Sequence, residues 1–154
     1  DASKLGDLMQ GASGGTTLDQ LKQQFGDPSS SSSDTTNGVK TDLLTWDNVQ
    51  GGFGASVIVS FTDGKAFAKN LTGFKLSRKQ KIDLAAFNSW QNGMKYADFT
   101  AKYGQPDYYD ETLIGGTTTI VAGYTSGVKG DLGANFNVTF DNGALTGKTQ
   151  SNMK

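Results

Sequence analysis

The sequence predicts an α+β protein made of two tandem repeats, each a helix–loop–helix followed by a four-stranded antiparallel sheet. Two observations support this prediction. Landmark residues recur at a nearly constant offset along the chain, and in each copy a helical spacing of apolar residues gives way to the alternation typical of strands. Residues 1–72 form the first predicted repeat, residues 73–82 a linker and residues 83–154 the second repeat.

The duplication is clearest where the second predicted helix of each copy ends. Phe25-Gly26-Asp27-Pro28 is matched 78 residues later by Tyr103-Gly104-Gln105-Pro106, and Trp46 is matched by Tyr124 at the same offset. One inserted residue then changes the offset to 79, which pairs Val59 with Val138, Phe61 with Phe140 and Lys69 with Lys148. An offset kept across aromatic, Pro and Gly positions indicates an internal repeat rather than chance.

Each copy begins with two short predicted helices. In the second copy Leu84, Phe87 and Trp90 recur at three-residue spacing, which places them on one apolar face. The second helix of each copy stops at an aromatic-Gly-x-Pro segment, because Pro28 or Pro106 cannot continue a helix. The first copy carries equivalent apolar residues at Leu5, Leu8, Met9, Leu18, Leu21 and Phe25.

The rest of each copy has the alternation of antiparallel strands. Two-residue turn signals predict hairpins, because Gly and Asn accept the positive φ of such turns; they lie at residues 37–38, 63–64, 115–116 and 142–143. The predicted strands cover residues 29–35, 38–46, 54–61 and 64–71 in the first copy, and 107–113, 116–124, 132–140 and 143–151 in the second.

Alternation also predicts which face of each sheet packs against the helices. The apolar positions in the third strand of each copy define this core face: Val57, Val59 and Phe61, then Phe136, Val138 and Phe140. The intervening positions point the other way, because successive strand residues alternate between faces. This second face is predicted to be lined mainly by small polar side chains and left uncovered.

The composition excludes several classes of active site. The chain has no Cys and no His, which removes disulfides, thiol nucleophiles and the usual general base of hydrolytic triads. A net charge of −1 does not provide the basic field that nucleic-acid binding requires, and no run of about 18 apolar residues could span a membrane. We therefore predict a protein that is not an enzyme, with no cofactor, no metal site and no nucleic-acid partner.

Two groups of charged residues are predicted to be solvated. Asp107, Asp110 and Glu111 are interpreted as the charged edge of a strand, with Tyr108 and Tyr109 as candidate interface anchors. The basic residues of the linker are interpreted as a solvated segment; a site for an anionic polymer or for lipid headgroups is the alternative. They are Lys75, Arg78, Lys79 and Lys81.

A pattern in the second copy resembles a known family. It consists of aromatic-x-x-Trp-x-x-Gly-Met, a short helix ending in aromatic-Gly-x-Pro, and a closing strand, carried by Phe87, Trp90, Gly93, Met94, Tyr103, Gly104, Pro106 and residues 140–145. The pattern resembles the β-lactamase inhibitory protein (BLIP) superfamily over residues 4–151, and BamE/SmpA-type lipoproteins share the same half. The tandem form looks like BLIP-like lipoproteins of Gram-positive bacteria.

The resemblance implies that the two sheets form one concave surface on which a partner protein is clamped. In the BLIP superfamily a hairpin-loop Asp enters the active site of the inhibited enzyme. Here Gly54 occupies the matching loop end, and the nearest acids are Asp47 and Asp131. The disulfides of the BLIP repeats are also absent, because the chain has no Cys.

These observations predict a non-catalytic, extracytoplasmic protein-binding module, secreted or anchored by a lipid on a Cys upstream of Asp1. One alternative is an inhibitor of a β-lactamase or penicillin-binding enzyme, and another is a structural lipoprotein of envelope assembly. The candidate partner-binding residues are Trp46, Phe53, Ser56, Ile58, Ser60, Tyr108, Tyr124, Asn135, Asn137 and Thr139. For Trp46 and Tyr124 a place in the core is an equal alternative.

Overall fold

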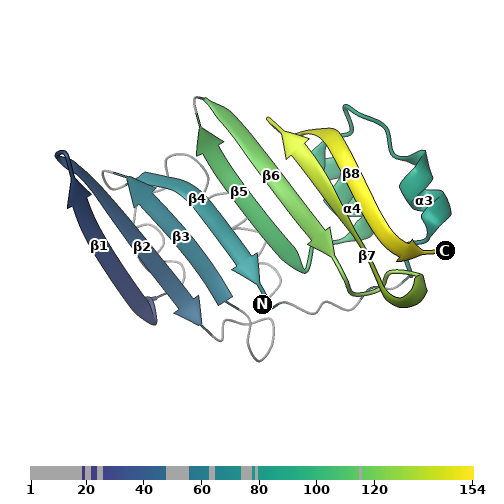
Figure 1. The fold of residues 1–154 in the computed structure, drawn as a ribbon, viewed down its shortest axis with the longest axis horizontal. Helices are drawn as coiled ribbons and strands as arrows, with labels where there is room; N and C mark the ends of the chain where they lie inside the picture. Colours follow the sequence, from purple (N-terminus) through teal and green to yellow (C-terminus); the bar gives the residue numbers. More distant parts are fainter. Residues whose placement is uncertain are drawn as a thin grey trace.

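The computed structural model describes residues 26–47, 56–62, 65–73, 80–114 and 116–154, together with Asp19, Lys22, Gln23 and Arg78. These residues form one eight-stranded antiparallel sheet in which the strands lie side by side in sequence order (Figure 1). The elements are β1 (Ser30–Thr36), β2 (Val39–Asp47), β3 (Ser56–Thr62), β4 (Lys65–Thr72), α3 (Leu84–Ser89), α4 (Tyr96–Tyr103), β5 (Tyr108–Ile114), β6 (Thr117–Tyr124), β7 (Gly130–Asp141) and β8 (Ala144–Met153).

The α+β class is confirmed, but the expectation of two separate sheets is wrong. β4 pairs with β5, with Ala68 opposite Thr112 and Leu71 opposite Tyr109, so the strands of both halves share one hydrogen-bonded sheet. Sequence alternation specifies strands and faces, whereas pairing between distant strands depends on tertiary packing. Joining the halves removes two sheet edges that would otherwise expose unpaired backbone groups.

The pairing registers repeat between the two halves. Ser30 lies opposite Thr45 in the first half, and Tyr108 lies opposite Gly123 in the second. The strands that follow repeat this correspondence, because Trp46 opposite Val57 is matched by Tyr124 opposite Phe136. All eight predicted strands are present. The predicted helices of the first half fall almost wholly outside the described residues.

Two of the predicted hairpin turns have the expected backbone. Asn37 and Gly38 have φ of 54° and 80°, and Asn142 and Gly143 have φ of 49° and 84°. Both positions of such a turn are left-handed, which Gly and Asn tolerate best. The turns predicted at residues 63–64 and 115–116 include residues that lie outside the described part.

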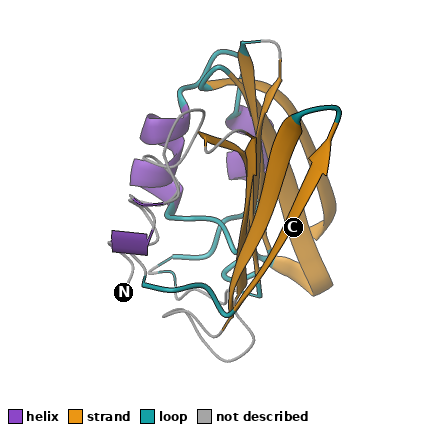
Figure 2. Ribbon diagram, turned by 90° about the vertical axis from the view of Figure 1, so that its left-hand side faces the viewer, coloured by secondary structure: helices purple, strands orange, loops and turns teal. Residues whose placement is uncertain are grey.

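Helices α3 and α4 lie on one side of the sheet (Figure 2), where they pack against strands of the second half. α3 begins at Asp83, whose carboxylate accepts a hydrogen bond from the Ala86 amide at 2.8 Å and so caps the helix. At the other end, the Lys148 ammonium donates to the carbonyl oxygens of Phe87 at 2.6 Å and Trp90 at 3.0 Å. α4 ends at Gly104, which has a φ of 87°.

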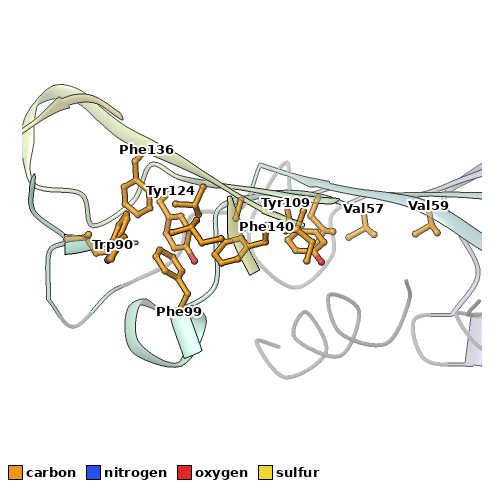
Figure 3. Packing of buried hydrophobic residues seen from close by; sticks show 14 of the residues in the cluster. Val57, Val59, Trp90, Phe99, Tyr109, Tyr124, Phe136 and Phe140 are labelled. Atoms are coloured by element: carbon orange, nitrogen blue, oxygen red, sulfur yellow. The ribbon is translucent and has the colours of Figure 1, made fainter. Parts of the chain in front are cut away.

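The core lies between the helices and the sheet and is dominated by aromatic rings (Figure 3). Trp90 of the α3 C-cap contacts Phe99 of α4, with ring centroids 4.8 Å apart, and Tyr124 stacks on Phe136 at 4.7 Å. The predicted core face is confirmed, since Val57, Val59, Phe61, Phe136, Val138 and Phe140 are all buried.

Among the described helices, none combines the length and the apolar character required to cross a membrane.

Candidate interaction surface

The face of the sheet opposite α3 and α4 is the open face. No described helix covers it (Figure 2). Its side chains follow from the strand registers, because directly paired residues point to the same side of a sheet. One row across the sheet consists of Ser32, Leu43, Ser60, Ala68, Thr112, Thr119 and Asp141, and the adjacent row consists of Thr45, Ile58, Asn70, Asp110, Val121 and Thr139.

Seven of the ten predicted binding residues lie on this open face. Tyr108 is 37% exposed there, and Asn137 is exposed. The others are half-buried by neighbouring strands: Ser56, Ile58, Ser60, Asn135 and Thr139. Phe53 lies outside the described residues. The structure therefore brings side chains from both halves of the chain onto one surface.

Trp46 and Tyr124 do not belong to this surface. Each is the direct register partner of a core residue, Val57 and Phe136 respectively, so each points to the side of the sheet on which α3 and α4 lie. Both are buried; the Trp46 indole donates to the Gly26 carbonyl oxygen at 3.1 Å, and the Tyr124 hydroxyl donates to that of Gly104 at 2.8 Å. Both side chains therefore belong to the core, and neither is exposed on the open face.

Tyr108 is held at the junction between the two halves. The Asn70 amide of β4 donates to its hydroxyl at 3.2 Å. On the other side, Gly123 gives it room, because a Cβ there would lie 3.0 Å from Tyr108 Cβ and 2.9 Å from Asn137 Oδ1. An exposed aromatic ring fixed by its neighbours loses little freedom on binding, which is typical of an interface anchor.

Two features of this part of the molecule differ from what the sequence pattern predicted or did not follow from it. Asp110 lies on the open face between Asn70 and Val121, and its carboxylate has no hydrogen bond or ion pair with any described residue. Strand alternation would have placed it there once Tyr108 was assigned to that face. Leu43 on the open face is 42% exposed, and Leu132 near the start of β7 is fully exposed.

The acidic cluster assigned to a solvated edge has a different role. β5 is an interior strand, and its Glu111 points toward the helices, where it forms an ion pair with Lys69 of β4 at 2.8 Å. Both side chains are buried, and the Tyr109 hydroxyl donates to Glu111 Oε2 at 2.6 Å. This buried network lies at the β4–β5 junction, on the opposite side of the sheet from Asn70 and Asp110.

The buried network changes how its members titrate. Burial lowers the pKa of the Lys69 ammonium, while the adjacent Glu111 carboxylate opposes that change. Burial also raises the pKa of Tyr109, and the negative charge of Glu111 raises it further. Tyr96 is affected by burial and by Glu111 in the same direction. These tyrosines are therefore neutral hydrogen-bonding and packing groups in the folded protein.

The linker is also not simply a solvated segment. The Arg78 side chain is buried and forms an ion pair with Asp107 at 3.1 Å, while its guanidinium lies 4.6 Å from the centre of the Tyr124 ring. It donates three further hydrogen bonds to backbone carbonyl oxygens, those of Tyr103 at 3.1 Å, Gln105 at 2.9 Å and Ser126 at 2.7 Å. Arg78 is therefore not available to bind an anionic polymer or a lipid headgroup.

Among the described residues, no three His, Cys, Asp or Glu side chains are grouped in a way that could hold a metal ion. The two buried ion pairs, Lys69–Glu111 and Arg78–Asp107, are structural, and the half-buried Lys148 binds carbonyl groups at the end of α3. What the open face offers is a broad polar surface with an aromatic and aliphatic centre. Such a surface can recognise another macromolecule.

The fold and this surface define an α+β protein in which the eight described strands form one meander and the two described helices lie on the same face. The chain belongs to the family described as a Domain of Unknown Function with solved-structure structure (DUF3862), whose model matches residues 1–153. The search of curated proteins gave no match.

The fold is similar to the crystal structure described as a putative beta-lactamase inhibitor protein from Streptococcus mutans. The TM-score is 0.79 with 28% sequence identity, over 94% of this chain and 88% of that chain. This similarity supports the resemblance to the BLIP superfamily at the level of the fold.

Proposed function

We propose that this protein is a non-catalytic protein-binding module that receives its partner on the open face of the sheet. The observation that carries this proposal is the open face itself: an eight-stranded sheet whose described helices, α3 and α4, lie on the other side. Its centre combines Tyr108, Ile58 and Val121 with surrounding Ser, Thr and Asn side chains. Aromatic and aliphatic anchors within a polar rim are the usual anatomy of a protein interface.

Each repeat, 1–72 and 83–154, contributes about half of this surface in the proposal, and together they form one concave surface. The Tyr108–Asn70 hydrogen bond supports the joint use of both halves, since it connects β5 to β4 across the junction. We place the protein outside the cytoplasm, secreted or anchored by a lipid at the cell surface. A structural role in envelope assembly would use the same surface.

A second candidate function is inhibition of a β-lactamase or of a penicillin-binding enzyme. The similarity to the Streptococcus mutans protein favours it, because that likeness covers nearly the whole chain at 28% identity. The test is a panel of purified serine β-lactamases and penicillin-binding proteins, assayed with a chromogenic β-lactam or a fluorescent penicillin. Loss of activity at micromolar protein supports inhibition, whereas unchanged activity across the panel rejects it.

Site-specific photo-crosslinking tests the open face without assuming a partner. A benzoylphenylalanine at Thr139 on the open face is compared with one at Lys102, which is exposed on α4. We expect a defined adduct from position 139 and none from position 102. The captured protein is then purified and its affinity measured. Identical adducts from both positions, or capture through position 102 alone, would contradict the proposal.

A further inference from the structure

Charge is distributed unevenly between the two faces of the sheet. Four strands contribute an acidic residue to the open face: Asp34 of β1, Asp47 of β2, Asp110 of β5 and Asp141 of β7. Within the described strands, the register places one Lys or Arg at an open-face position, Lys65 opposite Thr62. The net charge of −1 for the whole chain therefore conceals an acidic face.

Four described cations lie away from the open face. Lys69 and Lys148 point to the helix side of the sheet, where the first binds Glu111 and the second binds carbonyl groups at the end of α3. Lys40 shares the helix side of β2 with Leu44, and Lys102 is exposed on α4. The positive charges of these four residues are thus directed away from the open face.

The aspartates of the open face differ in the hydrogen bonds that their carboxylates accept. Asp141 accepts hydrogen bonds from the hydroxyls of Thr119 at 2.7 Å and Thr146 at 2.9 Å, which hold the pKa of its carboxyl below the usual range. Asp47 accepts a hydrogen bond from Ser56 at 3.3 Å. Asp110, beside the Tyr108 anchor, has no described partner of its own. These aspartates belong to different strands, so their negative charges are spread across the open face.

We propose that the partner surface received by the open face is basic, rich in Lys and Arg; this inference rests on the proposed protein-binding function. Four acids spread over separate strands match an extended cationic protein surface better than a single small cation. The same charge disfavours a second copy of this chain docked face to face, because like charges would meet. Electrostatic complementarity of this kind accelerates encounter and selects among partners, while the apolar centre contributes affinity.

A pair of peptides tests this inference. One alternates Lys with Tyr, the other alternates Glu with Tyr, and amide chemical shifts of the protein are followed by NMR during each titration. We expect the cationic peptide to shift amides of the open face, including those of Asn70, Asp110 and Val121, and to lose affinity as salt is added. The anionic peptide should leave these amides unchanged.

Charge variants give the matched control. Asp110→Asn combined with Asp141→Asn should weaken binding of the Lys-Tyr peptide by roughly fivefold, as expected for two exposed charge pairs. Asp98→Asn on α4 removes the same kind of charge from an exposed site away from the open face and should have no effect. Equal binding of both peptides, no binding of either, or shifts confined to the helices would overturn the inference.

The two proposals can fail separately. If the photo-crosslinked partner binds the open face but its affinity is the same for the Asp110→Asn/Asp141→Asn variant, the basic partner is rejected and the binding function stands. If the partner attaches through the helix side, the binding function itself is rejected.

Discussion

At the scale of single residues, the alternation of side chains along each strand decides which of them are exposed on the open face. Trp46 and Tyr124 have the chemistry of binding anchors, yet each is paired directly with a core residue and is buried. The alternation around Val57 and Phe136 was correctly predicted, but the register that joins neighbouring strands was not known from the sequence. Tyr108 has the opposite parity from Tyr109, and only Tyr108 remains exposed.

Truncation of a core aromatic tests the assignment of faces. Phe140 is fully buried, so Phe140→Ala should lower the free energy of unfolding by about 3–5 kcal/mol through lost burial and a cavity. Thr139→Ala, one residue away on the open face, should change it by about 0.5 kcal/mol or less. Urea denaturation of both variants measures the difference. Similar losses for the two would show that the faces are wrongly assigned.

Removing one member of the buried ion pair should lower the stability more than removing both members. Lys69→Met leaves the Glu111 carboxylate buried near Tyr109 without its ammonium partner, which should cost about 3–5 kcal/mol. Combining Lys69→Met with Glu111→Leu removes both charges and should recover much of that loss. Denaturation of both variants checks this expectation. A double variant less stable than Lys69→Met would contradict it.

The buried tyrosines predict a loss of stability at alkaline pH. Burial raises the pKa of Tyr96, Tyr109 and Tyr124, so the folded protein keeps protons that the unfolded chain releases near pH 10. Their stabilising contribution is therefore complete below about pH 10 and declines as the pH rises above it.

Ultraviolet absorbance and circular dichroism followed together measure this behaviour. Tyrosinate from these three residues should form in one cooperative step that coincides with unfolding, and Tyr109→Phe should reduce its amplitude. Gradual ionisation of these tyrosines in a protein that stays folded would contradict the assignment.

At the scale of elements, local patterns predicted each strand, whereas the contacts that join elements were not visible. The linker was predicted to be solvated because its charges cluster in sequence. Arg78 instead forms an ion pair with Asp107 and donates hydrogen bonds to the carbonyl oxygens of Tyr103 and Ser126. No local periodicity encodes such a contact. The same reason explains why the β4–β5 pairing, with its buried Lys69–Glu111 pair, was missed.

Two glycines with similar backbones test the Arg78 contact. Gly127 and Gly38 have φ of 66° and 80°, so an Ala at either position is strained by about 1 kcal/mol. A Cβ at Gly127 would also lie 2.7 Å from Arg78 Cδ, whereas one at Gly38 would meet nothing within 4 Å. Gly127→Ala should therefore cost about 1–3 kcal/mol more than Gly38→Ala in urea denaturation. Equal costs would mean that Arg78 does not pack against Gly127.

At the scale of the whole molecule, the described helices lie on one face of the sheet and leave the other face open. The repeats predicted from the sequence supply equivalent strands, and their union into one sheet produces a surface wider than either half could provide. The second face of each repeat was correctly predicted to be polar. That the two halves are continuous, with Tyr108 and Asp110 at the junction, required the structure.

The most direct test of the open face as a binding surface is the affinity of the crosslinked partner for two lysine variants, measured by calorimetry. Val121→Lys places a charged chain at the centre of the open face, and Ala101→Lys places one at an exposed site on α4. We expect Val121→Lys to weaken binding by at least about 2 kcal/mol, roughly thirtyfold, and Ala101→Lys to leave it unchanged. Full affinity in Val121→Lys, or a loss only in Ala101→Lys, would contradict the account.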